Sequence, residues 1–149
     1  MANTLTSLQA YDLLPGPKND LNVIVLYNYP YTVSNPYGHA SLFSIQANGY
    51  YLLADWGQTN MDSYVTLTNY IDYTKNHFPA NNYALVLADH GMGYAGFCYD
   101  YHAPHPYYDY ALGDCLTVGE IRTALSVTGG VDVLFLDTCS GGPSKLCGN

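Results

Sequence analysis

A histidine and a cysteine in this sequence each follow a run of apolar residues. "ALVLADHG" delivers His90 and Gly91, and "VLFLDTCSGG" delivers Cys139. A cysteine is a nucleophile once it is deprotonated, and a nearby imidazole favours the thiolate. If the two runs form neighbouring parallel strands, both side chains lie at one edge of a sheet. The pattern predicts a Cys-His pair, although a single cysteine at a strand end is more often a small buried hydrophobe.

The residues that follow these two side chains are small. Gly91 and the glycines after Cys139 leave backbone N–H groups uncovered. Such groups can hold an oxyanion, which forms when a nucleophile adds to a carbonyl. The two segments together are therefore typical of an enzyme that attacks a carbonyl group.

The elements that must position these residues can be predicted from local patterns. Apolar runs predict buried strands at residues 21–29, 83–89 and 131–137. Asn48-Gly49 between residues 39–46 and 50–55 predicts a hairpin. Residues 91–114, rich in Gly, Pro and Tyr, are expected to form one long loop.

Three segments have helical patterns. Leu5, Leu8 and Leu13 have helical spacing, and residues 60–78 repeat apolar side chains with a helical period, with Asp62 or Ser63 as the cap. The last helix begins with a capping box, Thr117 and Glu120. Apolar strands that alternate with helices predict an α/β fold: a mainly parallel sheet with helices on both faces, in one domain over residues 1–149.

Composition excludes several classes of protein. The 149 residues carry a net charge of −8, which opposes binding to nucleic acid or to an anionic membrane. No apolar stretch reaches the length of a membrane span, and the first residues do not resemble a secretory signal. Tyrosine occurs 17 times, a richness that suits extracellular proteins and self-associating surfaces.

The remaining cysteines and the candidate metal ligands give weaker signals. Cys98 and Cys115 flank the long loop and could be bridged in an oxidising compartment, whereas a bridge between Cys147 and Cys139 would abolish the nucleophile. No Cys-x-x-Cys zinc pattern occurs. We expect no cofactor. The remaining candidates are His102 and His105 for a metal, and Asp100, Asp109 and Asp114 for calcium without an EF-hand loop.

The segment from residue 60 to residue 142 resembles the clostripain-like cysteine peptidases, in the clan that includes caspases, legumains and gingipains. The resemblance rests on the helix, "FPA" turn, strand and His-Gly-x-Gly of residues 60–94, and on "VDVLFLDTCSGG" with its Asp-x-Cys-x-x-Gly. It implies a caspase-haemoglobinase-like three-layer sandwich, truncated here at both ends. A partial peptidase domain of this kind would associate with a second chain that completes it.

The resemblance also implies roles for individual residues. Cys139 would be the nucleophile, His90 the general acid-base, and the N–H groups of Gly91 and Cys139 the oxyanion hole. Asp137 would bind a basic side chain, so that peptide or protein substrates are cut after Arg or Lys. The alternative role for Asp137 is to cap a nearby backbone turn. Lys145 is a candidate site of self-cleavage.

Two functions from different classes follow. The first is a cysteine endopeptidase, expected outside the cell or at its surface. The second is a catalytically inactive protein that self-assembles as a homo-oligomer, built on a degenerate peptidase fold whose exposed strand edges pair with other copies. A clean active monomer would favour the first function, and inert polymers would favour the second.

Overall fold

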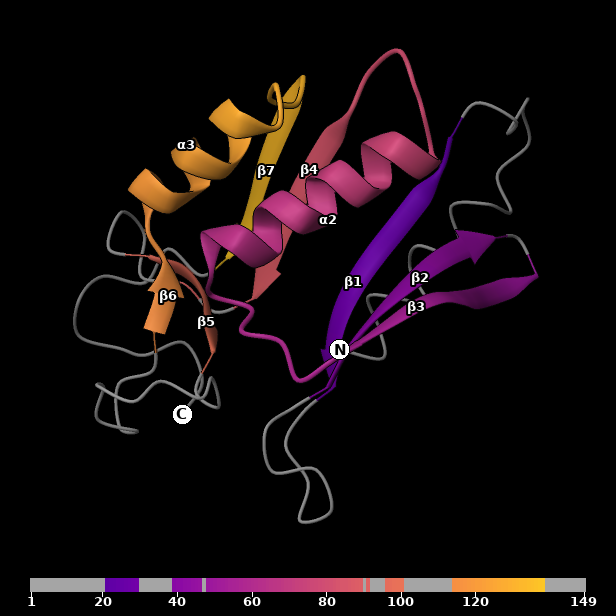
Figure 1. Ribbon diagram of the computed structural model, residues 1–149, viewed down its shortest axis with the longest axis horizontal. Helices are drawn as coiled ribbons and strands as arrows, with labels where there is room; N and C mark the ends of the chain where they lie inside the picture. Colours follow the sequence, from indigo (N-terminus) through magenta and orange to yellow (C-terminus); the bar gives the residue numbers. More distant parts are fainter. Residues whose placement is uncertain are drawn as a thin grey trace. The chain divides into compact units, whose positions relative to one another are not determined.

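The structure of the protein, a computed structural model, describes residues 21–29, 39–46, 48–89, 91, 96–100 and 114–138 (Figure 1). The chain divides into two compact units, residues 1–58 and residues 59–149, and each is described by itself. The helix predicted around Leu5, Leu8 and Leu13 lies outside the described residues. The single domain over residues 1–149 stays a prediction.

The first unit is a three-stranded antiparallel sheet in the order β1-β2-β3. Its strands are β1 (Val23–Tyr29), β2 (His39–Gln46) and β3 (Gly49–Gly57). The predicted hairpin is confirmed, and Gly49 begins β3 with a φ of 146°, which a residue with a side chain rarely adopts. The central strand β2 is buried along most of its length, whereas most of β1 is half-buried.

The described residues of the second unit form two helices and four strands. In chain order these are α2 (Tyr64–His77), β4 (Ala84–Asp89), β5 (Phe97–Asp100), β6 (Asp114–Leu116), α3 (Val118–Val127) and β7 (Val133–Thr138). β4 and β7 pair in parallel, and β5 and β6 pair antiparallel. No helix among the described residues is long and apolar enough to cross a membrane.

Both helices start where local sequence signals place them. Ser63 is the cap of α2, and its side chain accepts a hydrogen bond from the N–H of Val65 at 3.2 Å. At α3 the capping box is complete: Thr117 Oγ1 accepts from the N–H of Glu120, whose carboxylate accepts from the N–H of Thr117. Unsatisfied N–H groups of the first turns are paired in this way, which fixes the start of each helix.

The core of the second unit joins both helices to β4 and to the β5–β6 hairpin. Its buried members are Leu67 and Ile71 of α2, Leu85 and Leu87 of β4, Phe97 of β5, Leu116 of β6, and Ile121 and Ala124 of α3. The two helices are also tied together by Lys75, whose ammonium donates hydrogen bonds to the carbonyl groups of Thr128 and Gly130. The β4–β7 strands are thus held beneath two connected helices.

The expectation of one long loop over residues 91–114 is wrong at its two ends. β5 and β6 form a short hairpin there, and Gly91 forms an isolated antiparallel bridge with Phe97. The physical reason is burial: Phe97 and Leu116 are opposite each other in this hairpin, and both side chains are buried in the core. Residues 101–113 lie outside the described residues.

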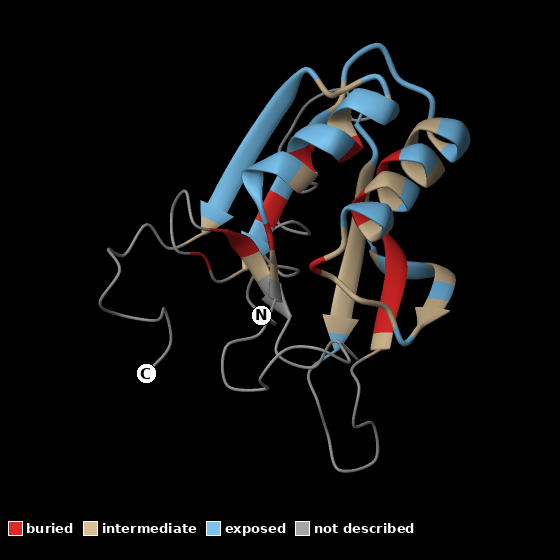
Figure 2. Cartoon of the chain, turned by 60° about the vertical axis from the view of Figure 1, so that its left-hand side comes forward, coloured by how far each residue is buried: buried red, intermediate tan, exposed pale blue. Residues whose placement is uncertain are grey.

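The strand predicted at residues 131–137 is confirmed as β7, but the prediction that it is buried is wrong. Five of the six residues of β7 are exposed, whereas Leu85 and Leu87 of its neighbour β4 are buried (Figure 2). β4 is the strand that pairs with β7 among the described residues, and the opposite edge of β7 has no strand beside it there. An apolar strand is buried only when other elements cover its faces.

Candidate active site

The two strands that carry the candidate catalytic residues are direct neighbours. β4 and β7 run parallel without a register shift, from Ala84 opposite Val133 to Asp89 opposite Thr138. Asp89 immediately precedes His90, and Thr138 immediately precedes Cys139. The predicted arrangement of two neighbouring parallel strands is confirmed, and the last paired residues are those directly before the histidine and the cysteine.

His90 and Cys139 themselves lie outside the described residues. Their roles as general acid-base and nucleophile therefore stay predictions. In a parallel pair the carboxyl ends lie at the same edge of the sheet, and opposite residues are about 5 Å apart. Asp89 and Thr138 are opposite each other in this pair. In the sequence, His90 directly follows Asp89, and Cys139 directly follows Thr138.

Gly91 is the described residue of the predicted oxyanion hole. It is buried and forms the isolated bridge with Phe97 at the start of β5. The backbone just after His90 is therefore attached to the β5–β6 hairpin, whose Phe97 and Leu116 are part of the core. Its role as an oxyanion donor stays a prediction.

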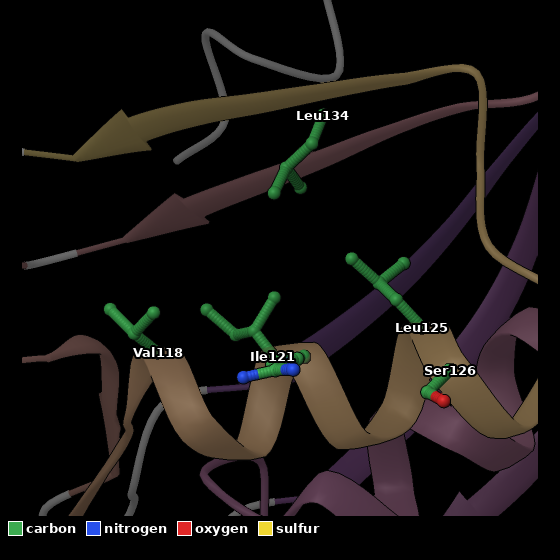
Figure 3. Close-up of a pocket in the computed structure, with 6 residues that line it drawn as sticks. Val118, Ile121, Leu125, Ser126 and Leu134 are labelled. Carbon is green, nitrogen blue, oxygen red and sulfur yellow. The ribbon is translucent and has the colours of Figure 1, made fainter.

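Asp137 lies one residue before the end of β7, opposite Ala88, and its side chain is exposed. Side chains alternate between the two faces of a strand. Leu134 points toward α3 (Figure 3), so Asp137, three positions later, belongs to the face away from that helix. An exposed carboxylate at this position is available to a charged group from solution. Its part in substrate binding stays a prediction.

The sequence analysis missed the hairpin beside the strand ends. β5 contacts both β4 and β7. Its Cys98 lies close enough to Asp89 for the carboxylate to act on the thiol: burial raises the pKa of Cys98 to about 12, and the charges of Asp89 and Cys115 add to this. The missed signal was the pair of apolar residues Phe97 and Leu116 at the two ends of a polar segment.

The metal candidates are only partly described. His102, His105 and Asp109 lie outside the described residues. Asp100 and Asp114 are opposite each other in the β5–β6 pair. In the part of the chain that the structure describes, no group of three or more metal-ligating side chains comes together. Calcium binding stays a prediction.

One hollow of the second unit lies away from the strand ends. It has a volume of about 480 Å³ and is lined by Val118, Ile121, Arg122, Leu125, Ser126 and Leu134. Figure 3 shows Val118, Ile121 and Leu125 on α3 directed toward the strands, with Leu134 of β7 directed toward the helix. The hollow is an unfilled space between a helix and a strand, and four of its six lining residues are aliphatic.

The fold is the caspase-like α/β fold of a class of cysteine proteases. Two solved structures of a secreted cysteine protease from Bacteroides thetaiotaomicron share it. One, bound to an irreversible peptide inhibitor, matches with a TM-score of 0.61 at 17% identity, and the other, named iotapain, with 0.62 at 16%. Each match covers 93% of this chain, but only 38% and 40% of the two solved chains.

The chain belongs to the clostripain family, whose sequence profile matches residues 15–146. It is similar to clostripain of Hathewaya histolytica, with 30% identity over 103 residues, which is 60% of this chain and 18% of clostripain. The chain therefore spans less than half the length of each of these relatives. The resemblance drawn from the residues is confirmed at the level of the family.

Proposed function

We propose that this chain is the part of a cysteine endopeptidase that carries the Cys139–His90 pair and that cuts after Arg or Lys. The observation that carries the proposal is the parallel pairing of Asp89 with Thr138 in a chain of the clostripain family. Asp89 and Thr138 directly precede His90 and Cys139 in the chain, so their pairing supports an imidazole and a thiol that lie near each other. A nucleophile and its base must be within hydrogen-bond reach of each other, and adjacent strand ends provide that spacing.

The proposed reaction has two steps. In the first, the Cys139 thiolate adds to the scissile carbonyl carbon, and the N–H groups of Gly91 and Cys139 stabilise the oxyanion. Protonated His90 then gives its proton to the leaving amine, and a thioester remains. In the second, His90 takes a proton from water, which attacks the thioester and releases the acid product. These steps use protein groups alone.

Asp137 provides the proposed selectivity for a basic side chain. Its exposed carboxylate is on the same strand as the nucleophile, two residues before Cys139. A carboxylate accepts paired hydrogen bonds from a guanidinium group and a charge-assisted hydrogen bond from an ammonium group. A substrate side chain held by Asp137 would bring the bond after it near the thiol. The net charge of −8 also attracts basic peptides.

The self-assembling alternative is not favoured by the family of the chain. Self-assembly can still be tested, because the exposed apolar side chains of β7 could pack against another copy of the chain. We propose an extracellular location, which is supported by the secreted protease of the same fold and by the similarity to clostripain.

The test uses reporter peptides that differ only in the residue before the scissile bond: Arg, Lys or an uncharged residue. Cys139→Ala, His90→Ala and the double variant should each lose about a thousandfold or more in kcat/KM, and the double variant should be no worse than either single one, because the two groups act as a unit. Cys147→Ser is the matched control and should keep wild-type activity. Additive losses, or an active Cys139→Ala variant, would contradict the mechanism.

Asp137→Asn tests the selectivity separately. It keeps the size of the side chain and removes its charge, so kcat/KM for the Arg and Lys peptides should fall by about a hundredfold. Cleavage of the uncharged peptide should change little. An equal loss on all three peptides would assign Asp137 a structural role instead.

A further inference from the structure

We infer that Cys98 and Cys115 are the two halves of a disulfide that closes the β5–β6 hairpin. The structure holds both residues as half-buried thiols. Phe97 is opposite Leu116, so the next positions inward on the two strands are the two cysteines. The inference concerns this hairpin alone and does not depend on peptidase activity.

The register of the hairpin places both cysteines between its two paired positions. Phe97 pairs with Leu116, and Asp100 pairs with Asp114. Between these two pairs, β5 has two residues and β6 has one. Cys98 and Tyr99 therefore oppose the single residue Cys115, which is the arrangement of a β-bulge. Opposite residues of antiparallel strands have Cα atoms about 4.5–5.5 Å apart, within the range of about 4.4–6.8 Å that disulfides span.

The backbone at Cys98 is unusual for a residue with a side chain. Its φ is 54°, the left-handed region that favours glycine, and the first position of one type of bulge is ordinarily a glycine with this conformation. A cysteine at this position costs conformational energy that a glycine would not. A covalent bond to the opposite residue gives the side chain a function that glycine cannot provide.

The thiol of Cys98 is partly shielded from solvent and lies among charged neighbours. Burial is the largest cause of the raised pKa of Cys98, and the charges of Asp89 and then of Cys115 add to it. Asp89 at the end of β4 is the charged group that acts on Cys98 from a neighbouring strand. Because its pKa is raised, Cys98 is a neutral thiol near pH 7 and forms a thiolate only at alkaline pH.

The reaction that forms the bridge is thiol–disulfide exchange with a small disulfide such as oxidised glutathione. One protein thiolate attacks a sulfur of glutathione disulfide and releases one glutathione thiol. The second protein thiolate then attacks the mixed disulfide and releases the other. The protein is oxidised by two electrons, glutathione disulfide is reduced by two, and both protons leave on the released thiols. Because the thiolate is the reactive form, the bridge should form faster at pH 9 than at pH 7.

The location of the bridge can be read from tryptic peptides of the unmutated chain. Trypsin cuts after Lys75 and Arg122, so both cysteines of the hairpin remain in one peptide, residues 76–122. The other two cysteines, Cys139 and Cys147, lie in other peptides. After equilibration with oxidised glutathione and blocking of remaining thiols, mass spectrometry should show residues 76–122 lighter by two hydrogens and unlabelled. Reduction should then expose two thiols in it.

The stability of the bridged chain provides the second measurement. The bridge should raise the midpoint of thermal unfolding by about 5–10 °C over the reduced chain, because it closes a loop in the unfolded state. Cys98→Ser and Cys115→Ser are the matched controls and should show no such rise. The inference would be overturned if peptide 76–122 kept both thiols at pH 9 under conditions that bridge the urea-unfolded chain. A bridge to Cys139 or Cys147 would overturn it as well.

Discussion

Two neighbouring strands of nearly the same composition, β4 and β7, differ in how the protein covers them. Leu85 and Leu87 of β4 are 4% and 7% exposed, whereas their partners Leu134 and Leu136 on β7 are 37% and 44% exposed. On the opposite face the strands are alike, since Val86 and its partner Phe135 are both more than half exposed. The difference is therefore confined to the face that carries the helices.

The cause of this difference is the packing of the two helices. Leu67 and Ile71 of α2 join the core with Leu85 and Leu87 of β4. Beside β7, Leu134 lines the hollow between this strand and α3 instead. An apolar pattern therefore specifies a strand, whereas the packing of the covering helices decides how far each strand is buried.

The largest expected effect tests this difference directly. Leu87→Ala should destabilise the chain by about 2–4 kcal/mol, because it leaves a cavity in the core. Leu136→Ala, at the opposite residue of β7, should cost about 1 kcal/mol or less, because the removed atoms are already partly hydrated. Urea unfolding of both variants measures the two values. Equal losses would mean that β7 is as well covered as β4.

A second effect appears at alkaline pH on the α2 side. Tyr70 packs against the core, and burial raises its pKa to about 12 from an ordinary value of 10.0. The folded state thus holds this proton more tightly than the unfolded state, so the associated stability is present below pH 10 and is lost as the pH rises toward 12. Tyr70→Phe should flatten the fall in unfolding free energy over this range.

The control for this measurement lies on the same helix. Tyr64 is 43% exposed, so Tyr64→Phe should leave the alkaline limb of the stability curve unchanged. If the two variants gave the same curve, ionisation of Tyr70 would not contribute to alkaline unfolding.

A smaller effect concerns the start of α3, the helix over β7. Thr117→Ala removes one side of the capping box and should cost about 1 kcal/mol. Thr123→Ala in the same helix is the control, because the Thr123 hydroxyl only donates back to the carbonyl of Gly119. Its effect should be below about 0.5 kcal/mol. Thermal unfolding of both variants measures the two losses. A larger loss for Thr117→Ala than for Thr123→Ala would show that the cap itself stabilises the helix.

The smallest effect on stability is expected on the exposed face that the two strands share. Phe135→Ser should change the unfolding free energy by about 0.5 kcal/mol or less, since the ring is 58% exposed. It should nevertheless reduce self-association, because it interrupts an exposed apolar surface next to a strand edge. Size-exclusion chromatography over a range of concentrations measures this. Val86→Ser, at the opposite residue of β4, should act in the same direction.

Much of the fold could be predicted because its signals are local. Thr117 with Glu120 specifies the start of α3, and Asn48-Gly49 specifies the hairpin of β2 and β3. These signals work because a cap or a turn is made by residues a few positions apart. The candidate site was reached by one further step, the inference that two apolar strands lie side by side, and the register of β4 and β7 confirms that step.

Two features could not be predicted, and both depend on residues distant in the chain. The β5–β6 pairing joins Phe97 to Leu116 through a bulge, and neither strand is long enough to show a periodic pattern. The exposure of Leu134 and Leu136 depends on where α3 packs, which no local pattern encodes. The roles of His90, Cys139, Gly91 and Asp137 stay predictions for the experiments above.

The sequence by itself determined the helices α2 and α3 and every described strand except β5 and β6, and it determined which strand ends are followed by a histidine and a cysteine. It did so because backbone preferences, caps and side-chain periodicity act within a few residues. Only the tertiary structure decided that β4 is buried on its helix-covered face while β7 is open, and that Cys98 and Cys115 lie between the paired positions of β5 and β6. Burial and cross-strand contact are properties of elements that meet in space, and the free energy of packing selects them only when the whole unit forms.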